Sequence, residues 1–513
     1  AFTDYPADRY GLILWDHGGA WVGGYGSDSQ NGTDEAPTAM AVPALAAAVR
    51  DALAAAGVTG VDGAPPLEFL AFDTCLMGGA EVASELANLS AVYIANAEID
   101  YGDGWDYEAT MTLLSEQPDI TATAFGVAEV EHWNQHHAEA SSSDVLLRAH
   151  IAIDTAKLPA FIEAHAAVAQ AWLADPAAAA LDVARGAFFS LPAYSSTVEQ
   201  VAPEPSLRDA GQFLDRLAAL PDGALADAAR DARAALDDMT LGVSLGQLRA
   251  ESQTGLHLEL SPASQLSDER LAAYADRAKE WNDATAWGDF LAEMTAQSDT
   301  EGPVITHEVV EAALPTISLS VEDLDVAEAR VDLARPDPED ADRRILYGLV
   351  GAGVVEPGAV YDFTWSGERL VLGDGAGGTQ DAYVFSWMDL GADGDGELVS
   401  PVLAVLGVFT SADGEPAQGV LLFQDGDATA TLAVVLEPSP VTFLLSQVAM
   451  ADPTATFTPL VPVVSLSSGE VQAVQGTPIT IPADGIPLET AVAEPGTYAL
   501  LTKARDIWGN DTL

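Results

Sequence analysis

Cys75, the only cysteine in the 513-residue chain, and His17 could together supply a nucleophile and its base. A thiol becomes a strong nucleophile only when a neighbouring imidazole raises its thiolate fraction. Cys75 closely follows the apolar run LEFLAF, and His17 closely follows the apolar run YGLILW. Each residue therefore comes just after a predicted strand and just before glycine, which frees the backbone to turn and lets a substrate approach. Because ligands bind beyond the carboxyl ends of strands in open α/β sheets, the pair predicts a reactive site there.

Each residue also has a plain structural interpretation. A single cysteine among apolar residues is often a small buried hydrophobe without chemistry. His17 taken alone is weaker evidence for a catalytic site than Cys75 taken alone. The catalytic hypothesis rests on the pairing of the two residues and on their equivalent positions after strands.

Alternating strand-like and helix-like segments between residues 10 and about 295 must position the pair. A loop rich in Gly, Ser and Asp is predicted at 18–38. Apolar runs predict strands at 12–15, 67–72, 91–97, 145–153 and 254–260. Helical patterns occupy 39–57 (closed by Gly57), 76–86, about 122–139, 156–174, and stretches within 206–238 and 267–297. This order predicts an α/β fold, a largely parallel sheet with helices on both faces.

The composition changes after about residue 300. Short alternating apolar runs separated by Gly, Pro and Asp are typical of an antiparallel sandwich or barrel. We therefore expect a first domain at 1–300 and an all-β, sandwich-like C-terminal region at 301–513, built as one or two modules. The segment ARPDPEDADRR (334–344) looks like a linker within this region.

The balance of charge excludes several classes of partner. The chain carries 79 acidic and 20 basic residues, a formal net charge of −59. Such a surface repels nucleic acid and anionic membranes. No apolar run approaches the roughly 18 residues of a membrane span, and the first residues do not resemble a signal peptide. A lone cysteine also excludes an internal disulfide.

The motifs WDHGGAW, FDTCLMG and YIANAEIDYGDGWDY, in this order and spacing, resemble the clostripain family of cysteine peptidases. Lesser agreement extends to SLRDAGQFLDRL, TGLHLELSP, TAWGDFLAEM and the closing KARDIWGNDTL. The family belongs to the caspase-like clan, with caspases, legumains, gingipains and separases. The resemblance therefore implies a caspase-like sheet flanked by helices and hydrolysis of protein or peptide substrates.

The resemblance places the family's catalytic roles on particular residues. His17 matches the catalytic histidine and Cys75 the nucleophile, and no third member is needed. The main-chain N–H groups of Gly18 and Cys75 would form the oxyanion hole. The thiolate would attack the peptide carbonyl, and water would release the resulting acyl-enzyme.

Related enzymes cleave after Arg or Lys, and Asp73 and Asp103 fall where pocket carboxylates would lie. Carboxylates suit such cationic side chains. Asp73 could instead cap the following helix, and Asp103 could belong to an ordinary Asp-Gly turn. Trp105 would line the pocket or pack in the core. Asp16 could orient the imidazole, although capping of main-chain N–H groups is the simpler role.

Metal sites have weaker support. His132 and His136 are spaced for zinc on a helix, but without an HExxH pattern they indicate, with His137, a solvated helix face. The acidic loop with Asp393, Asp395 and Glu397 suits Ca²⁺, although it lacks an EF-hand pattern. Some family members depend on Ca²⁺. We expect no cofactor for the chemistry itself.

Two departures from the family concern the N-terminal side of the site. Only sixteen residues precede His17, so we expect either that the strands usual in the family are missing or that a separate polypeptide supplies them. No Lys or Arg lies between Arg9 and Arg50, which disfavours self-cleavage at a basic residue there. The leading hypothesis is an extracellular or cell-surface endopeptidase. The alternative is a non-catalytic surface protein with a vestigial caspase-like domain, whose β-rich region binds a partner or Ca²⁺.

Overall fold

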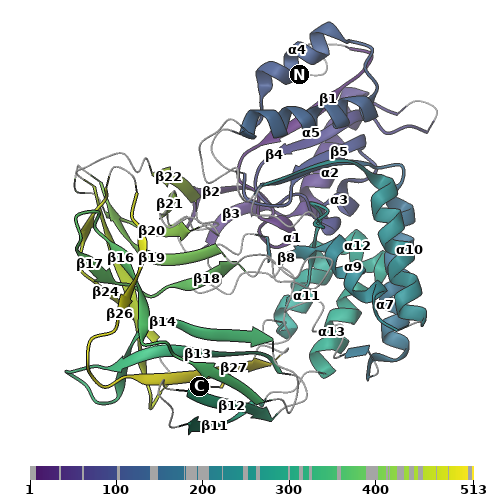
Figure 1. Cartoon of the computed structure of the whole chain (residues 1–513). Coiled ribbons are helices and arrows are strands. Elements are labelled where there is room, and N and C mark those ends of the chain that lie inside the picture. The colour runs from purple at the N-terminus through teal and green to yellow at the C-terminus, as the bar shows by residue number, and fades with distance from the viewer. Residues whose placement is uncertain are drawn as a thin grey trace. The chain divides into compact units, whose positions relative to one another are not determined.

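The computed structural model divides the chain into two compact units (Figure 1). Unit 1 comprises Ala1–Ser298 with Pro438–Thr442, and unit 2 comprises Asp299–Glu437 with Phe443–Leu513. The structure describes residues 7–33, 36–60, 63–100, 104–138, 148–177, 179–180, 193–194, 207–221, 223–246, 252–261, 266–297, 301–310, 316–322, 326–354, 360–388, 402–411, 414, 416–423, 432–437, 444–448, 455–468, 471–482, 485–506 and 511–512.

A five-stranded sheet organises unit 1. Its order is β1-β4-β5-β6-β9, with β1 at Gly11–Trp15, β4 at Leu67–Asp73, β5 at Ser90–Asn96, β6 at Ala149–Asp154 and β9 at Thr240–Leu245. The apolar runs predicted as strands at 12–15, 67–72 and 91–97 are confirmed, and the described part of the run 145–153 contains β6. β1, β4 and β5 are parallel, so their carboxyl ends meet at one edge.

The sheet is mixed, and the prediction of a largely parallel sheet was wrong for its second half. β6 is antiparallel to β5, and β9 is antiparallel to β6. In the described residues between β5 and β6 the chain forms the helices α4 (Tyr107–Glu116) and α5 (Ala122–Ala138). A strand parallel to β5 would need one crossover that carries the chain back to the end of the sheet where β5 begins. With these two helices in the connection, the chain can return instead to the end where β5 stops, and the next strand then runs antiparallel.

Side chains alternate between the two faces of the sheet, and α5 covers one of them. Phe69, Ala71, Val92 and Ile94 lie on this face and form a core with Phe125, Val130 and Trp133 of α5. The same alternation puts Asp73 and Asn96, the last residues of β4 and β5, on the α5 face. Asp73 and Asn96 therefore lie where the apolar residues of this face end.

The remaining helices of unit 1 pack largely on one another: α3, α7, α10 and α12 form a connected group (Figure 1). Their bounds are α1 Ala20–Gly23, α2 Val42–Ala56, α3 Ala80–Leu86, α7 Leu158–Ala174, α9 Ala210–Ala218, α10 Ala224–Met239, α11 Asp268–Arg277, α12 Lys279–Thr285 and α13 Trp287–Gln297. Gly57 ends α2 in the left-handed conformation, as predicted. None of the helices in the described ranges is long and apolar enough to cross a membrane.

Two segments of unit 1 differ from expectation. Residues 18–38 do not form only a loop, because α1 is followed by a hairpin of β2 (Tyr25–Thr33) and β3 (Ala36–Met40). The stretch 206–238 begins with a strand, β8 (Leu207–Asp209), which pairs with β10 (His257–Glu259) and with β7 (Ala193–Tyr194). β2 and β3 pair with each other, whereas β8 depends on pairing with segments distant in the sequence, which a local pattern cannot show.

Unit 2 is built from antiparallel strands, as the pattern after residue 300 predicted. Its largest sheet has the path β22-β21-β20-β19-β23-β14-β13-β27-β28, with β18, β24 and β25 attached at β19 and β23. The smaller sheets are β11-β12-β15 and β17-β16-β26. Strand bounds are β11 Val304–Val310, β12 Thr316–Glu322, β13 Val326–Pro336, β14 Arg343–Val354, β15 Val360–Thr364, β16 Glu368–Gly373, β17 Thr379–Asp381, β18 Phe385–Met388, β19 Val402–Thr410, β20 Pro416–Phe423, β21 Leu432–Glu437, β22 Leu444–Val448, β23 Thr456–Ser465, β24 Val471–Gln475, β25 Ile479–Thr480, β26 Leu488–Val492, β27 Ala499–Asp506 and β28 Asp511–Thr512.

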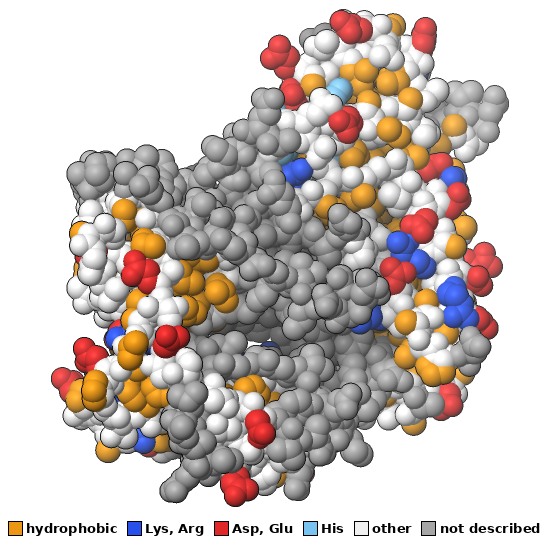
Figure 2. All heavy atoms as spheres, viewed as in Figure 1, with side chains coloured by type: hydrophobic (Ala, Val, Ile, Leu, Met, Phe, Trp, Pro, Cys, Tyr) orange, Lys and Arg blue, Asp and Glu red, His pale blue; other side chains and the backbone are white. Residues whose placement is uncertain are grey.

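The segment 334–344 is not a linker. It completes β13, turns, and begins β14, and the turn is closed by the Asp337 N–H donating to the Arg343 carbonyl at 3.0 Å. Its Pro and Asp residues belong to a hairpin connection, which has the same composition as a linker. Acidic side chains are prominent on the face drawn in Figure 2, in keeping with the net charge of −59.

Candidate active site

Two parallel neighbours, β1 and β4, deliver His17 and Cys75 to the same edge of the sheet. In their register Trp15 is the partner of Asp73. His17 lies two residues beyond Trp15, and Cys75 lies two residues beyond Asp73. The two loops therefore leave the sheet side by side, as the sequence predicted from the two apolar runs.

Gly18 brings the His17 loop against the main chain of Cys75. A Cβ atom at Gly18 would lie 2.2 Å from the Cys75 carbonyl oxygen and 2.9 Å from the Thr74 hydroxyl oxygen. Contacts this short are not tolerated, so only glycine lets the two loops approach in this way. On the other side of the loop, the His17 carbonyl accepts the Gly26 N–H at 2.9 Å.

Burial controls the chemistry of the Cys75 thiol. The residue is 5% exposed, and its Sγ accepts the Asp100 main-chain N–H at 3.3 Å. Burial, and then the nearby Asp100 carboxylate, raise the pKa of the thiol to about 12. The thiol is protonated at neutral pH in this state, so it needs a base in order to react. His17 is exposed at the neighbouring strand end.

The segment after Cys75 is held in an unusual conformation. Leu76 has φ +57°, in the left-handed region that non-glycine residues rarely adopt. Its N–H donates to the Glu98 carbonyl at 3.1 Å, and its own carbonyl accepts the Nε2–H of His257 at 2.9 Å. Tyr93 donates its hydroxyl to the next carbonyl, that of Met77, at 2.6 Å. These bonds fix the backbone on which the thiol stands.

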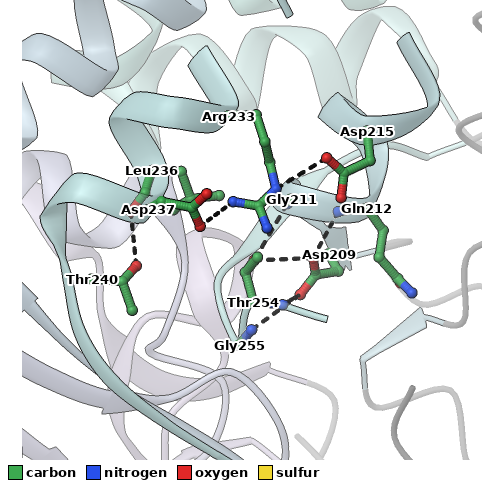
Figure 3. A network of polar contacts seen from close by, with 10 residues as sticks. All are labelled: Asp209, Gly211, Gln212, Asp215, Arg233, Leu236, Asp237, Thr240, Thr254 and Gly255. Atoms are coloured by element: carbon green, nitrogen blue, oxygen red, sulfur yellow. Dashed lines mark hydrogen bonds and ion pairs between the residues drawn. The ribbon is translucent and has the colours of Figure 1, made fainter. Parts of the chain in front are cut away.

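β10, which carries His257, is itself anchored by the buried carboxylate of Asp209 (Figure 3). Asp209 caps α9 by accepting the Gln212 N–H at 2.9 Å. It also accepts the N–H groups of Thr254 at 2.8 Å and of Gly255 at 3.1 Å. The segments that contain Asp209 and His257 are thereby joined, and together they support the main chain after Cys75.

Sequence reasoning missed His257, Tyr93 and Asp209 as supports of the site. The segments SLRDAG and TGLHLEL, which carry Asp209 and His257, indicated a family resemblance but no role in supporting the site. A buried histidine in a strand that also carries apolar residues could have been a weak signal. Their shared role depends on pairing between distant segments.

Asp73 lies directly beside the Cys75 segment and is 4% exposed. Its Oδ2 accepts the Tyr107 hydroxyl at 2.6 Å, whereas its Oδ1 is buried with no hydrogen-bond partner among the described residues. Burial, and then this hydrogen bond, raise the pKa of the Tyr107 hydroxyl above its usual range. A buried carboxylate oxygen without a partner is costly, so it marks a place for a donor or cation.

Of the other two residues predicted to bind substrate, Asp103 lies outside the described residues. Gly104, which follows it, packs against Asp73: a Cβ there would lie 2.8 Å from Asp73 Oδ1. Trp105 is buried in the core formed with α5 and stacks edge-on near Tyr107, with ring centroids 6.4 Å apart. Trp105 is placed to support the Asp73 region through packing.

Asp16 and the histidines of α5 have other partners. Asp16 Oδ1 accepts the main-chain N–H of His17 at 2.7 Å, the capping role considered for it. His132 Nδ1 lies 3.7 Å from a Glu129 carboxylate oxygen, and His136 Nδ1 lies 3.6 Å from one of Asp106. His137 is buried, and its ring contacts the Gly104 carbonyl at 3.1 Å. The prediction of a solvated helix face was wrong, because α4 and the loop before it pack against these residues.

The predicted Ca²⁺ residues Asp393, Asp395 and Glu397 lie outside the described residues. Within the part of the chain that the structure describes, no group of three or more His, Cys, Asp or Glu side chains is arranged to hold a metal ion.

Comparisons with known proteins found similarity in the part of the chain that carries these strand ends. Residues 1–223 match the model of the clostripain family. No match was found among curated proteins.

Two solved structures similar to this chain are described as C11 proteases. A secreted C11 cysteine protease from Bacteroides thetaiotaomicron, in complex with an irreversible peptide inhibitor, is 19% identical, with a TM-score of 0.42 over 56% of this chain and 75% of that chain. An inactive zymogen C11 protease from Parabacteroides distasonis is 16% identical, with a TM-score of 0.36 over 55% of this chain and 72% of that chain. The part of the chain that carries His17 and Cys75 lies within the residues that match the model of the clostripain family.

Proposed function

We propose that Cys75 and His17 act as a dyad that hydrolyses peptide bonds through an acyl-enzyme. His17 takes the thiol proton while Cys75 Sγ bonds to the substrate carbonyl carbon, and the same proton then passes to the leaving amine. Water next attacks the thioester, which releases the acid and restores the thiol. The parallel register of β1 and β4, with Gly18 against the Cys75 carbonyl, is the observation that carries this proposal.

The main-chain N–H groups of Gly18 and Cys75 are proposed to bind the oxyanion of the tetrahedral intermediate. Among the described residues, neither group donates to another residue, and the Cys75 N–H interacts with its own Sγ. N–H groups that are already oriented and free stabilise developing negative charge without reorganisation. This supports the roles that the resemblance implies for them.

Cleavage after Arg or Lys is proposed on the basis of Asp73. Its partnerless Oδ1 offers a buried acceptor for a guanidinium or ammonium group, and Tyr107 holds the other oxygen. Asp103 is proposed as a second carboxylate, because the adjacent Gly104 lies against Asp73. Action outside the cell or at its surface is proposed from the family match alone.

The direct test is hydrolysis of peptides that differ only in Arg, Lys, Asp or Leu at the cleaved position. Wild type, Cys75→Ala and His17→Ala would be compared with Ca²⁺ or with a chelator. We expect cleavage of the Arg and Lys peptides by wild type and a loss of at least about 10³-fold in Cys75→Ala. Undiminished cleavage by Cys75→Ala would contradict the proposal. A change on chelation would indicate that the acidic loop acts on the enzyme, since no step above uses a metal.

A further inference from the structure

The peptide unit between Thr74 and Cys75 determines where the Cys75 N–H points. A peptide unit is planar and nearly rigid, and in the trans form its C=O and N–H point in opposite directions. Any group that fixes the Thr74 carbonyl therefore also fixes the direction of the Cys75 N–H. That N–H is one of the two donors proposed for the oxyanion.

Asn96 fixes this carbonyl from the neighbouring strand. Its side-chain Nδ2 donates to the Thr74 carbonyl oxygen at 3.2 Å. Asn96 ends β5 and is buried, on the face covered by α5. Its main-chain carbonyl also accepts the Gly78 N–H at 2.7 Å, so one residue spans the loop on both sides of Cys75.

His150, on β6, fixes the amide of Asn96 in turn. His150 Nδ1 lies 2.7 Å from Asn96 Oδ1. Because Asn96 Nδ2 donates to Thr74, the Oδ1 atom can only accept, and His150 Nδ1 must carry the proton. Burial lowers the pKa of His150 to about 3, so the imidazole is neutral and keeps this single donor. An amide that could otherwise rotate by a half-turn is held with its NH₂ group toward Thr74.

Packing keeps His150 itself in place. Its ring stacks on Trp133 of α5, with centroids 4.3 Å apart and planes 8° from parallel. The contacts thus run from Trp133 through His150 and Asn96 to the peptide that bears the Cys75 N–H. Each member comes from a different element, α5, β6, β5 and the segment after β4.

We propose that Asn96, oriented by His150, is a positioning residue that aims the Cys75 N–H at the oxyanion of the intermediate. The inference rests on the proposed function, because it assigns a support to the oxyanion hole of that site. Nothing in it requires Asn96 or His150 to touch the substrate. Their effect should therefore be on the intermediate and not on the thiol or on substrate binding.

The test compares Asn96→Leu and His150→Phe with wild type by three measurements. These are kcat and KM for an arginine peptide, inhibition by the matching peptide aldehyde, and alkylation of Cys75 by iodoacetamide. The aldehyde forms a hemithioacetal whose oxygen needs the oxyanion hole, whereas alkylation needs only the thiolate. We expect kcat to fall and the aldehyde inhibition constant to rise by about 10- to 100-fold in both variants. KM and the alkylation rate should stay within about twofold, since the thiol itself is unchanged.

Further variants separate positioning from general destabilisation. His150→Asn can place an amide N–H near the lost Nδ1 donor and should recover part of kcat. His165→Phe changes another fully buried histidine, in α7, whose ring nitrogens have no partner among the described residues, and should leave all three readouts unchanged. If Asn96→Leu does not fold, His150→Phe, which retains a ring against Trp133, decides the question.

Unchanged kcat and aldehyde inhibition in either folded variant would overturn the inference, as would an equal fall in alkylation. Both results would leave the proposed function intact so long as Cys75→Ala is inactive. An active Cys75→Ala would overturn the proposed function and this inference together.

Discussion

Gly18 packs directly against the Cys75 carbonyl oxygen, 2.2 Å from where its Cβ would stand. This contact ties the loop after β1 to the loop after β4 and leaves no room for a side chain. The loops that carry His17 and Cys75 are held together by this glycine as well as by the pairing of β1 with β4.

Replacement of Gly18 by alanine should therefore disable the enzyme. The added methyl group would push the His17 loop away from Cys75, and a displacement of about 1 Å can cost 10²-fold in rate. Steady-state kinetics on the arginine peptide would measure the loss. Gly223→Ala, at the cap of α10, is a matched control, since a Cβ there meets nothing closer than 3.8 Å. Equal activity of the two variants would refute the tight approach.

Asp73→Asn should change specificity more than catalysis. The amide keeps an oxygen for the Tyr107 hydroxyl but removes the charge proposed to meet Arg or Lys. We expect kcat/KM to fall by at least about 30-fold for arginine peptides, the effect of an unpaired buried charge, and to change little for leucine peptides. Tyr107→Phe is the control, because it removes the hydrogen bond to the Asp73 carboxylate but keeps the charge. A parallel fall for all peptides would contradict the pocket.

His17→Ala should leave Cys75 as an ordinary buried thiol. Burial raises the pKa of that thiol to about 12, so without a base the thiolate is scarce below strongly alkaline pH. We expect iodoacetamide alkylation at pH 7 to fall by at least tenfold and to recover only as the pH rises toward about 12. Wild type should react at neutral pH. Identical pH profiles for the two proteins would show that His17 does not activate the thiol.

Glu81, in α3, should make stability depend on pH. Its Oε1 accepts the Glu259 N–H at 2.9 Å and the Tyr274 hydroxyl at 3.1 Å, while burial raises its pKa to about 7. The unfolded value lies near 4.3, so the protonated carboxyl stabilises the fold below that pH, and this contribution is lost as the pH rises through 7.

Glu81→Gln mimics the protonated carboxyl and should remove this loss. We expect the free energy of unfolding of the variant to exceed that of wild type only slightly near pH 5, and by about 1–3 kcal/mol more near pH 8. Denaturant unfolding at the two pH values measures both. A variant equally destabilised at pH 5 and pH 8 would show that Glu81 does not titrate in this range.

The sequence predicted the part of the fold that depends on local patterns. Apolar runs followed by glycine located β1 and β4, and with them the edge where His17 and Cys75 lie. The direction of β6 and the short strands β7, β8 and β10 could not be predicted, because pairing between distant segments decides them.

The residues that hold the Cys75 segment in place could not be predicted either, because they are distant from it or from one another in the sequence. Asn96 and His150 lie 54 residues apart, and His257 lies 181 residues beyond Leu76. Nothing in their local sequence indicates that they hold the Cys75 segment. The partnerless oxygen of Asp73, by contrast, agrees with a role that the residue's place before Cys75 had already suggested.

The central claim is that Cys75 is the nucleophile and that it attacks after a basic residue. Reaction with a peptidyl-arginine chloromethyl ketone, followed by peptide mass mapping, tests it most directly. We expect a single adduct on Cys75, formed much faster than with the leucine analogue and absent when a competing arginine peptide saturates the site. An adduct on another residue, or an enzyme inactivated without modification of Cys75, would contradict it.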